Sequence, residues 1–384
     1  MKALRNKILL NYIYLGKEHA GGKDQFALNL LCGIYENGDI DRVVVACYDY
    51  LQDTIRKIAP EAEVISLRSG ASNLELARMI RIQMTNTFTI PKIIREYGIR
   101  EVFHASCNNG LKKYQVPSVV IPHDIKAISH RVMGSVKVPW YKYIMYKFMY
   151  GVDFKNADKI IAISNNDMKE MHKYYPKYKD KIVQIYNPIK VEKPDIVWQG
   201  MNKHNDIVAI NLQFHHKNII TLIKAFEKVK DNIDCDLVLV GNVPDRVAYL
   251  KKYVHEHKLE DRVIFTGFVT SKEKRQILID SSLYVNPSLF EGFGMTAVEA
   301  MILKVPTLLS NESANYEVTG GMCRYYEPAD DVNALAEAIV SCIDNPKTGQ
   351  ELEEARTMMM DRYSYRKIAR QYIDLFEKEL NNEA

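Results

Sequence analysis

Residues Asn286 to Met301 read NPSLFEGFGMTAVEAM, and this stretch joins a glycine loop to two carboxylates. Gly292 and Gly294 belong to the pattern GxGxxA, which is typical of dinucleotide-binding loops. Glu291 and Glu299 lie on either side of the second glycine, with seven residues between them. The stretch indicates a phosphate-binding site, and the ligand must also carry groups that the two glutamates can bind.

A nicotinamide dinucleotide is the first candidate, but the position of the loop argues against it. A dinucleotide fingerprint belongs to the first strand–helix turn of a βαβ unit, whereas this loop lies late in the chain. Residues 289–291 also separate the preceding strand from the first glycine, where the fingerprint requires a tight turn. Glu312, about 20 residues downstream, is the feature that favours a dinucleotide.

A sugar nucleotide fits the stretch better. The two glycines let the backbone approach a ligand, and residues 295–297 open a helix whose first N–H groups have no partner within the helix. Such a helix end binds phosphate. Carboxylates such as Glu291 and Glu299 accept hydrogen bonds from hydroxyls, so the stretch predicts a sugar phosphate or nucleotide sugar. The alternative is that Glu299 is solvated and only favours the positive end of the helix.

Short apolar runs alternate with helical patterns on both sides of this stretch, which is typical of βαβ units and parallel sheets. In the first half, the predicted strands are KILLNYIYLG, DRVVVACYD, EVISL, EVFHAS, SVVIPHD and KIIAISN, and VQIYNPIK ends this half. In the second half they are IVAINL, DLVLVGN, RVIFTG, LYVNPS, VPTLLSN and CRYYEP. Helices are predicted near 23–38, 217–230, 244–258 and 271–281, from about 295, and over 363–380. The apolar positions near one face of the last helix are Ile368, Tyr372, Leu375 and Leu380.

The fold class is therefore α/β, with two doubly wound, Rossmann-like domains. We expect the first domain over residues 1–190 and the second over 200–365, joined by the polar residues 191–206. Ligands of such sheets bind beyond the carboxyl ends of the strands. Two such domains facing each other would place the site in the cleft between them.

The composition is that of a globular protein with two dissimilar halves. The 384 residues suffice for two domains, and 47% of them are hydrophobic and 26% charged. Residues 1–190 carry 29 Lys and Arg against 18 Asp and Glu, a net charge of +11, whereas the rest carries 23 against 30, a net charge of −7. The basic first half is expected to meet an anionic partner.

The cysteines and the N-terminus indicate a cytoplasmic protein. The six cysteines form no CxxC pair, which argues against a zinc site or a disulfide framework and predicts buried, reduced thiols. No run approaches the roughly 18 apolar residues of a membrane span. The start MKALRNKILLNYIYLG begins like a signal peptide, but Asn11 breaks the apolar run and no cleavage site follows, so we interpret it as a first strand.

The stretch FEGFGMTAVEAM resembles the Glu-x7-Glu motif of the retaining nucleotide-sugar glycosyltransferases of glycosyltransferase family 4, which have the GT-B fold. The resemblance covers nearly the whole chain. AGGKDQFALNLL resembles the family's first-domain glycine loop and VVIPHD its histidine-containing strand end, and HHKNIITLIKAF, LVLVGN and VIFTGFV follow in the family's order. The C-terminal helix, 366–384, resembles the segment that crosses back to the first domain. The resemblance implies an acceptor-side first domain and a donor-binding second domain.

The resemblance also implies roles for individual residues. His123 would contact the transferred sugar at a hydroxyl or phosphate oxygen, Lys217 would neutralise the diphosphate, and Glu291 would bind sugar hydroxyls near the anomeric carbon. Glu299 would bind the ribose diol, and the backbone around Val269 would contact the nucleobase. The implied catalytic residues are Glu291 and His123, and the implied donor-binding residues are Gly21, Gly22, Lys217, Val269, Gly292, Phe293, Gly294, Met295, Thr296 and Glu299.

One position departs from the family's pattern. The family usually has a Gly-Arg pair before the element that contains Lys217, with the arginine on the diphosphate. Counting back from Lys217, those positions hold Asn211 and Leu212. His215 and His216 lie nearby and would replace the arginine only when protonated. The remaining lysine and the helix amides are expected to sustain activity.

No metal ion or other cofactor is expected. Two Asp-x-Asp triplets, Asp39–Asp41 and Asp234–Asp236, resemble the divalent-metal motif of other glycosyltransferases. Both precede strands, and the beginnings of strands lie at the edge of the sheet away from the ligand crevice.

The resemblance implies a same-face attack on the sugar. A phosphate oxygen of the leaving group would take the acceptor proton, and Glu291 would orient the sugar electrostatically.

The acceptor side has one unusual segment. Residues 134–155, GSVKVPWYKYIMYKFMYGVDFK, are rich in aromatics and lysines, so they indicate either a helix on an anionic membrane surface or an ordinary helix whose aromatics are core. The membrane interpretation predicts a peripheral enzyme at the inner face of the cell membrane that acts on a lipid-linked saccharide. No nucleic-acid-binding motif accompanies the basic charge.

Three functions are compatible with these patterns. The first is a retaining, metal-independent hexosyltransferase in bacterial polysaccharide or glycolipid assembly. The second is a sugar-nucleotide epimerase of the GT-B type, which would need acid–base residues that the sequence does not reveal. The third is a non-catalytic, donor-binding partner subunit, which the missing arginine favours and the two glutamates oppose.

Overall fold

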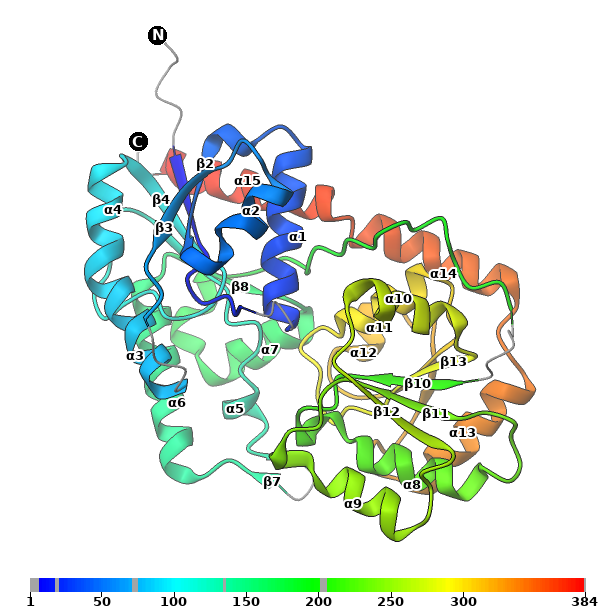
Figure 1. The fold of residues 1–384 in the computed structure, drawn as a ribbon. Helices are drawn as coiled ribbons and strands as arrows, with labels where there is room; N and C mark the ends of the chain where they lie inside the picture. Colours follow the sequence, from blue (N-terminus) through cyan, green and yellow to red (C-terminus); the bar gives the residue numbers. More distant parts are fainter. Residues whose placement is uncertain (1–6, 18–20, 71–74, 134–135, 201–205, 383–384) are drawn as a thin grey trace. The chain divides into compact units, whose positions relative to one another are not determined.

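The computed structural model describes residues 7–17, 21–70, 75–133, 136–200 and 206–382 (Figure 1). The chain divides into two compact units. Unit 1 comprises Met1–Ser129, Pro139–Lys190 and Tyr363–Ala384, and unit 2 comprises His130–Val138 and Val191–Arg362. The chain therefore enters unit 2 briefly at His130–Val138, enters it again after Lys190, and returns to unit 1 at Tyr363.

Unit 1 is built on a parallel sheet with the strand order β3-β2-β1-β4-β5-β8-β9. These strands are β1 (Lys7–Asn11), β2 (Val43–Tyr48), β3 (Glu63–Leu67), β4 (Ile99–His104), β5 (Ser118–Val120), β8 (Lys159–Ala162) and β9 (Ile182–Gln184). Its helices are α1 (Gly22–Glu36), α2 (Gln52–Ile58), α3 (Glu75–Met84), the π-helical turn η3 (Thr85–Thr89), α4 (Ile90–Glu96), α5 (Lys126–Ser129), α6 (Trp140–Asn156), α7 (Asn165–Tyr174) and α15 (Tyr365–Asn382). The central strands are buried, as apolar runs in a parallel sheet should be.

Unit 2 repeats this plan with the strand order β12-β11-β10-β13-β14-β15, again all parallel. The strands are β10 (Ile207–Ile210), β11 (Leu237–Val240), β12 (Val263–Gly267), β13 (Leu283–Asn286), β14 (Thr307–Ser310) and β15 (Arg324–Tyr326). The helices are α8 (Ile219–Val229), α9 (Tyr249–Glu256), α10 (Ser271–Asp280), α11 (Met295–Ile302), α12 (Asn315–Thr319), α13 (Val332–Asp344) and α14 (Gly349–Arg362), with the 3-10 turns η5 (His215–Lys217) and η6 (Asp245–Val247). A short hairpin, β6 (Val132–Met133) and β7 (Val136–Lys137), is assigned to the same unit.

The strand order places a topological switch point in each sheet. Counted within its unit, each sheet begins with the order 3-2-1-4-5-6 of a doubly wound dinucleotide-binding fold. The order reverses between β1 and β4 in unit 1 and between β10 and β13 in unit 2. The loops that follow these strands are therefore where a ligand crevice is expected in each unit.

The predicted α/β fold class is confirmed, and every apolar run predicted as a strand forms one. The sequence treated the basic aromatic segment 134–155 as one piece of the first domain, and this is wrong because the structure divides the segment between the two units. The part up to Val138 belongs to unit 2, whereas α6 belongs to unit 1, and residues 134 and 135 lie outside the described residues. Among the described helices, none is long and apolar enough to cross a membrane.

Part of the expected linker is folded onto unit 2. Val197 is buried, and the Trp198 backbone N–H donates to the Leu303 carbonyl at 2.9 Å. The Trp198 indole donates to the Ser281 carbonyl at 2.8 Å. The polar composition predicted only a linker here, but the Trp198 side chain anchors it to unit 2.

The returning helix α15 packs on α1, as expected for the segment that crosses back to the first domain (Figure 1). Its stripe of apolar residues is shifted from the predicted one, because Leu375 is only half-buried while Phe376 is fully buried. Phe103 of β4 lies 5.3 Å from the Tyr372 ring and 5.5 Å from the Phe376 ring, centroid to centroid. These aromatic contacts fix the helix to the sheet.

Gly33 of α1 lies directly against α15. A Cβ atom at Gly33 would meet the Tyr365 carbonyl oxygen and would lie 2.7 Å from the Ala369 Cβ. We therefore expect Gly33→Ala to lower the free energy of unfolding by roughly 1–3 kcal/mol, because a backbone oxygen cannot move aside as a side chain can. Urea unfolding measures the effect. Gly151→Ala, a helical glycine of α6 with open space around it, is the matched control and should not destabilise.

Candidate functional site

Two loops meet at the switch point of unit 2. The first follows β10 and contains η5, and the second follows β13 and leads into α11. The Leu289 N–H of the second loop donates to the His216 carbonyl of the first at 2.8 Å. The carboxyl ends of β10 and β13 thereby bring Lys217 and Glu291, which are 74 positions apart in sequence, into contact.

Glu291 is a buried carboxylate surrounded by donors. Its Oε1 accepts hydrogen bonds from the Lys217 ammonium at 2.6 Å, the Ser288 hydroxyl at 2.7 Å and the Asn286 amide at 3.0 Å. Burial raises the pKa of Glu291, but the charge of Lys217 and these hydrogen bonds outweigh burial and hold the pKa below its usual range. Glu291 is therefore ionised at neutral pH. These three hydrogen bonds all end on Oε1.

Gly294 forms the N-cap of α11 in a left-handed conformation, with φ of +86°. A side chain would be strained there, so the sequence needs glycine at this position. The N–H groups of Met295 and Thr296 begin the helix and have no acceptor within it. Phe293 lies just before the cap and is 3% exposed. The helix end that the sequence predicted as a phosphate cradle therefore directly follows the loop that holds Glu291.

Glu299 projects from α11 toward α10, and it is 9% exposed. Its Oε2 accepts a hydrogen bond from the Lys274 ammonium at 2.6 Å. The start of α10 is fixed by a capping box between Thr270 and Glu273, directly after Val269 at the carboxyl end of β12. Glu299 is therefore paired, not solvated. Lys274 was not predicted from the sequence, since no local pattern joins it to a glutamate 25 positions away.

The position of the missing arginine is part of the core. Leu212 is fully buried in the hydrophobic cluster of unit 2, and Asn211 before it has φ of +76°. His216 is 7% exposed, and His215 stacks on Tyr249 with ring centroids 5.4 Å apart. A cation at residue 212 would have to be buried among apolar side chains.

Arg246, which the sequence analysis did not single out, supplies a cation to the same loop. Its guanidinium lies 4.5 Å from the centroid of the Phe214 ring. Its Nε donates to the Gln213 carbonyl at 2.6 Å. The loop that lacks the family's arginine therefore has an arginine from η6 beside it.

His123 lies in unit 1, just beyond β5, with a positive φ of 66°. It is 5% exposed, and its Nε2 lies 2.9 Å from the Ala105 carbonyl oxygen. A carbonyl only accepts, so Nε2 carries the proton and Nδ1 is the free acceptor of the ring. Burial, and after it the charge of Lys23, lower the pKa of His123 to about 3. The ring is therefore neutral at physiological pH.

Gly21 and Gly22 lie at the exposed beginning of α1, where Gly21 is the N-cap. A Cβ atom at Gly21 would meet no atom within 4 Å, so packing within the chain does not explain a glycine there. The two residues before it, His19 and Ala20, lie outside the described residues.

A second polar cluster, also missed from the sequence, lies at the switch point of unit 1. The Asn11 amide at the end of β1 donates to the Asn86 carbonyl oxygen at 2.7 Å and lies 3.0 Å from His104 Nδ1 at the end of β4. Burial lowers the pKa of His104 to about 3. The neutral cluster ties η3 to the centre of the sheet.

The two Asp-x-Asp triplets lie at the amino ends of β2 and β11 and form ion pairs there. Asp39 lies 3.4 Å from an Arg42 nitrogen and 3.2 Å from an Arg370 nitrogen, and Asp236 lies 2.6 Å from Arg262 Nε. In the ranges that the structure describes, no three His, Cys, Asp or Glu side chains assemble into a metal-binding group.

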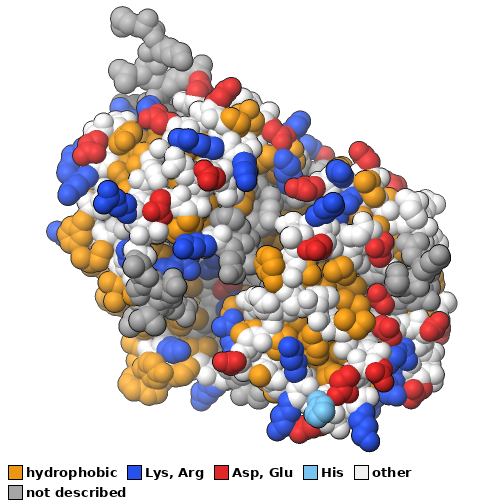
Figure 2. All heavy atoms as spheres, viewed as in Figure 1, with side chains coloured by type: hydrophobic (Ala, Val, Ile, Leu, Met, Phe, Trp, Pro, Cys, Tyr) orange, Lys and Arg blue, Asp and Glu red, His pale blue; other side chains and the backbone are white. Residues whose placement is uncertain are grey.

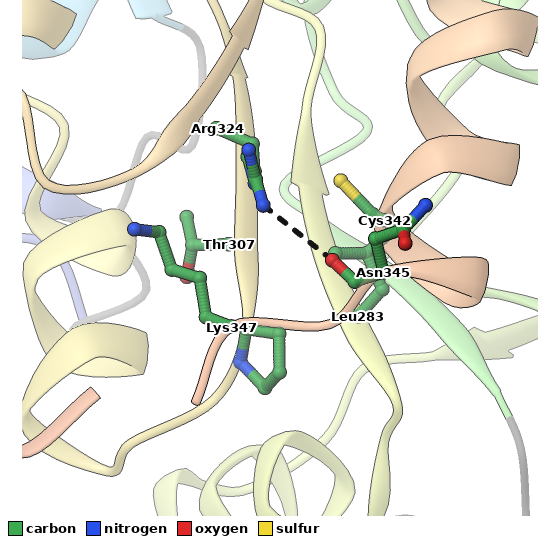
Figure 3. A pocket seen from close by; sticks show the side chains of 7 residues that line it. Leu283, Thr307, Arg324, Cys342, Asn345 and Lys347 are labelled. Atoms are coloured by element: carbon green, nitrogen blue, oxygen red, sulfur yellow. Dashed lines mark hydrogen bonds between the residues drawn. The ribbon is translucent and has the colours of Figure 1, made fainter. Parts of the chain in front are cut away.

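A small pocket of unit 2 also lies away from the switch point (Figure 3). Leu283, Thr307 and Arg324, which line it, are the first residues of β13, β14 and β15. Arg324 donates to the Asn345 carbonyl at 3.5 Å across this pocket. It therefore opens at the amino ends of the strands, on the edge of the sheet opposite Lys217 and Glu291.

Comparisons with known proteins identify the family. A family model described as Glycosyltransferase Family 4 matches residues 21–193, and one described as Glycosyl transferases group 1 matches residues 197–359. The chain is a family 4 glycosyltransferase. The two models adjoin within the connection between the units, and the second contains Lys217, Glu291 and Glu299.

Relatives of this glycosyltransferase include two mannosyltransferases. It is 23% identical to the O-antigen chain mannosyltransferase RfbU of Salmonella typhimurium over 84% of this chain and 88% of that protein. It is 24% identical to the serotype-specific mannosyltransferase WbdA of Escherichia coli over 92% of this chain, but it spans only 45% of WbdA. Among solved structures, Anabaena HepE in complex with UDP and glucose superimposes with a TM-score of 0.72 at 16% identity, over 97% of this chain and 99% of HepE. The glycosyltransferase therefore has the GT-B fold.

Proposed function

We propose that this glycosyltransferase moves a hexose from a nucleoside diphosphate sugar to a saccharide acceptor, with retention at the anomeric carbon and without a metal ion. Unit 2 binds the donor, and unit 1 faces the acceptor. The observation that supports this most strongly is the contact between Lys217 and Glu291 beside the N-terminus of α11, at the switch point of unit 2.

Departure of the nucleoside diphosphate is the demanding step, because negative charge builds on its phosphate. Lys217 and the first amides of α11 stabilise that charge from fixed positions. Arg246 adds a second cation near the same loop. The acceptor hydroxyl attacks on the face that the phosphate leaves, and a phosphate oxygen takes its proton.

Glu291 acts as an ionised group in this scheme. Its lowered pKa excludes a role as general acid near neutral pH, since an acid must hold a proton to give. Its carboxylate accepts hydrogen bonds from sugar hydroxyls, and its charge stabilises the oxocarbenium-like sugar. Glu299 binds the ribose diol while Lys274 keeps its charge balanced.

His123 contacts a sugar hydroxyl in this scheme. Its Nε2–H is engaged by Ala105, so the ring offers Nδ1, which accepts from a hydroxyl and has no proton to donate to a phosphate oxygen. The family resemblance allowed His123 to contact either a sugar hydroxyl or a phosphate oxygen. The protonation of Nε2 favours the hydroxyl.

The neutral state of His123 predicts a specific pH dependence. Its pKa is lowered to about 3, so its protonation does not change between about pH 5 and 8. His123→Asn, in which Asn tolerates the positive φ, should lower kcat by roughly 10–100-fold, by the same factor at every pH in this range. A ratio of wild-type to variant kcat that changes through about pH 6.5 would show that the imidazolium is the working form.

The acceptor is proposed to be a lipid-linked saccharide in the assembly of a bacterial surface polysaccharide or glycolipid, with the enzyme at the inner face of the cell membrane. Two mannosyltransferase relatives make mannose the first sugar to test. No observation in the structure specifically favours the epimerase or the partner-subunit alternative.

A transfer assay tests the proposal. Purified protein is incubated with isotopically labelled nucleoside diphosphate hexoses, with and without lipid-linked saccharides, and the products are analysed by NMR. The expected result is acceptor-dependent release of nucleoside diphosphate and a product that keeps the donor's anomeric configuration. Conversion of the donor sugar without acceptor would indicate an epimerase, and binding without turnover on any acceptor would indicate a partner subunit.

A further inference from the structure

Helix α6 exposes a broad apolar face. Its buried residues, Asp153, Phe154 and Asn156, all lie near its C-terminal end. Trp140 is 70% exposed and Phe148 68% exposed, and Ile144 lies between them at a spacing of four residues. Tyr141 and Met145 are exposed beside this stripe. The exposed aromatics Trp140, Tyr141 and Phe148 are therefore not core residues, whereas Phe154 near the C-terminal end is. The ordinary-helix interpretation of the sequence thus holds only for that end of α6.

A second exposed apolar stripe lies on α3 and η3 of the same unit. Ile80, Met84 and Phe88 follow each other at a spacing of four residues and are 55%, 50% and 56% exposed. Residues this far apart share one side of a helix. This stripe was not predicted from the sequence, because apolar residues at helical spacing are usually interpreted as residues of the hydrophobic core.

The two stripes are held on one framework by the loop that follows β4. The backbone N–H groups of Asn108 and Asn109 each donate to the Asp153 carboxylate of α6 at 3.1 Å. The Asn86 amide of η3 donates to the Asn108 carbonyl. The Leu111 N–H donates to the Thr87 hydroxyl of η3 at 3.2 Å. Both stripes are thus fixed to the same short loop of unit 1.

The segment of chain that contains the α6 stripe carries charge of one sign. No carboxylate occurs between Asp124 and Asp153, and five basic residues do. Lys142 and Lys147 are exposed on α6, and no ion pair joins either of them to a carboxylate of the described residues. Figure 2 shows hydrophobic side chains gathered with Lys and Arg over the region where Figure 1 places α6.

We propose that this aromatic–basic surface, formed by the exposed stripe of α6 with Lys142 and Lys147 and by the exposed stripe of α3 and η3, docks on an anionic lipid bilayer. Trp and Tyr prefer the membrane interface, and lysines beside an apolar stripe bind anionic headgroups. A protein partner would need acidic groups to pair with these lysines, whereas an anionic bilayer supplies both the acyl region and the charge. The proposal rests on the membrane location in the proposed function and names the surface that would bind the bilayer, and it does not depend on the donor site.

Vesicle binding tests the proposal directly. Wild-type protein should co-sediment with vesicles of phosphatidylcholine and phosphatidylglycerol at low salt, and more weakly at high salt or with phosphatidylcholine alone. Each lysine near an anionic surface raises the affinity for it about fivefold. Lys142→Gln with Lys147→Gln should therefore weaken vesicle binding at least tenfold. Trp140→Ser with Phe148→Ser should abolish binding to both kinds of vesicle, and Ile80→Ser with Phe88→Ser should weaken it.

Matched controls separate this surface from general effects. Arg56→Gln with Lys57→Gln removes two exposed charges of α2, and Tyr97→Ser removes an exposed aromatic at the end of α4. Both should bind vesicles within about twofold of wild type. Glu291→Gln should also bind as wild type does, so failure of this proposal and failure of the proposed function are distinguishable. Circular dichroism melting confirms that each variant is folded.

Tryptophan fluorescence shows which part of the protein enters the bilayer. The chain has two tryptophans, Trp140 and Trp198, so Trp198→Phe leaves Trp140 as the reporter. Its emission should shift to the blue when anionic vesicles are added. An unshifted emission, vesicle binding that survives Trp140→Ser with Phe148→Ser, or a dimer in solution that this double variant dissociates would each overturn the proposal.

Discussion

Replacing Glu291 by Gln is expected to lower kcat for sugar transfer by roughly 10²–10⁴-fold, because a fixed charge at the reacting sugar is lost. The substitution keeps the size of the side chain and lets an amide oxygen accept from Ser288 and Asn286. The fold should therefore survive, and donor affinity should change much less than kcat. Single-turnover kinetics with saturating donor measure the chemical step.

Glu312→Gln is the matched control for this prediction. Glu312 is a half-buried glutamate beyond β14, and a dinucleotide-binding interpretation of the glycine loop would make it the ribose ligand. The variant should retain wild-type kcat within a few-fold. A Glu291→Gln enzyme that keeps wild-type kcat would remove Glu291 from the mechanism. A Glu312→Gln enzyme that loses activity would favour the dinucleotide-binding interpretation of the loop.

Replacing Lys217 by Met is expected to damage both activity and stability. The ammonium stabilises the leaving phosphate, so kcat should fall by roughly 10²–10³-fold. It also neutralises the buried Glu291 carboxylate at 2.6 Å, so its removal should cost about 3–5 kcal/mol of unfolding free energy. Urea unfolding monitored by circular dichroism measures the stability term.

A double variant separates the two effects. Lys217→Met combined with Glu291→Gln removes the unpaired charge, so it should regain most of the lost stability while remaining inactive. Lys230→Met, which breaks the exposed pair with Asp231, should cost at most about 1 kcal/mol. A double variant no more stable than Lys217→Met alone would show that the lysine stabilises unit 2 by packing.

The pair also predicts a dependence on pH. The pKa of Glu291 is lowered in the folded protein, so the stabilisation is complete above the unfolded carboxyl pKa, about 4.3, and is lost as the pH falls through the folded value. The stability difference between wild type and Lys217→Met should therefore shrink on acidification below about pH 4. A difference that stays constant down to that range would contradict the ion pair.

The fold was predictable because its strands are continuous apolar runs separated by turn signals, and such runs need no long-range information. The glycine loop was predictable for a similar local reason, since Gly294 caps the helix that it precedes. The exposed faces of α3 and α6 were not, because an apolar stripe looks the same in sequence whether it is buried or exposed.

The partners within the site were not predictable for a different reason. Lys274 reaches Glu299 from another helix, and Arg246 reaches the loop after β10 from the loop after β11. Such contacts depend on how the strands are ordered in the sheet. The burial of Leu212 likewise follows from its position just beyond β10, where its side chain joins the core cluster.

The central claim is that the switch point of unit 2 binds a nucleoside diphosphate sugar through Lys217, Glu291 and Glu299. Thermal unfolding of wild type, Glu299→Gln and Glu312→Gln with a panel of nucleoside diphosphates, nucleotide sugars and NAD tests it most directly. One nucleoside diphosphate series should raise the melting temperature of wild type and Glu312→Gln, and much less that of Glu299→Gln, since a ligand at 100 times its Kd stabilises by about 2.7 kcal/mol. Stabilisation by NAD alone, lost in Glu312→Gln and kept in Glu299→Gln, would contradict the claim.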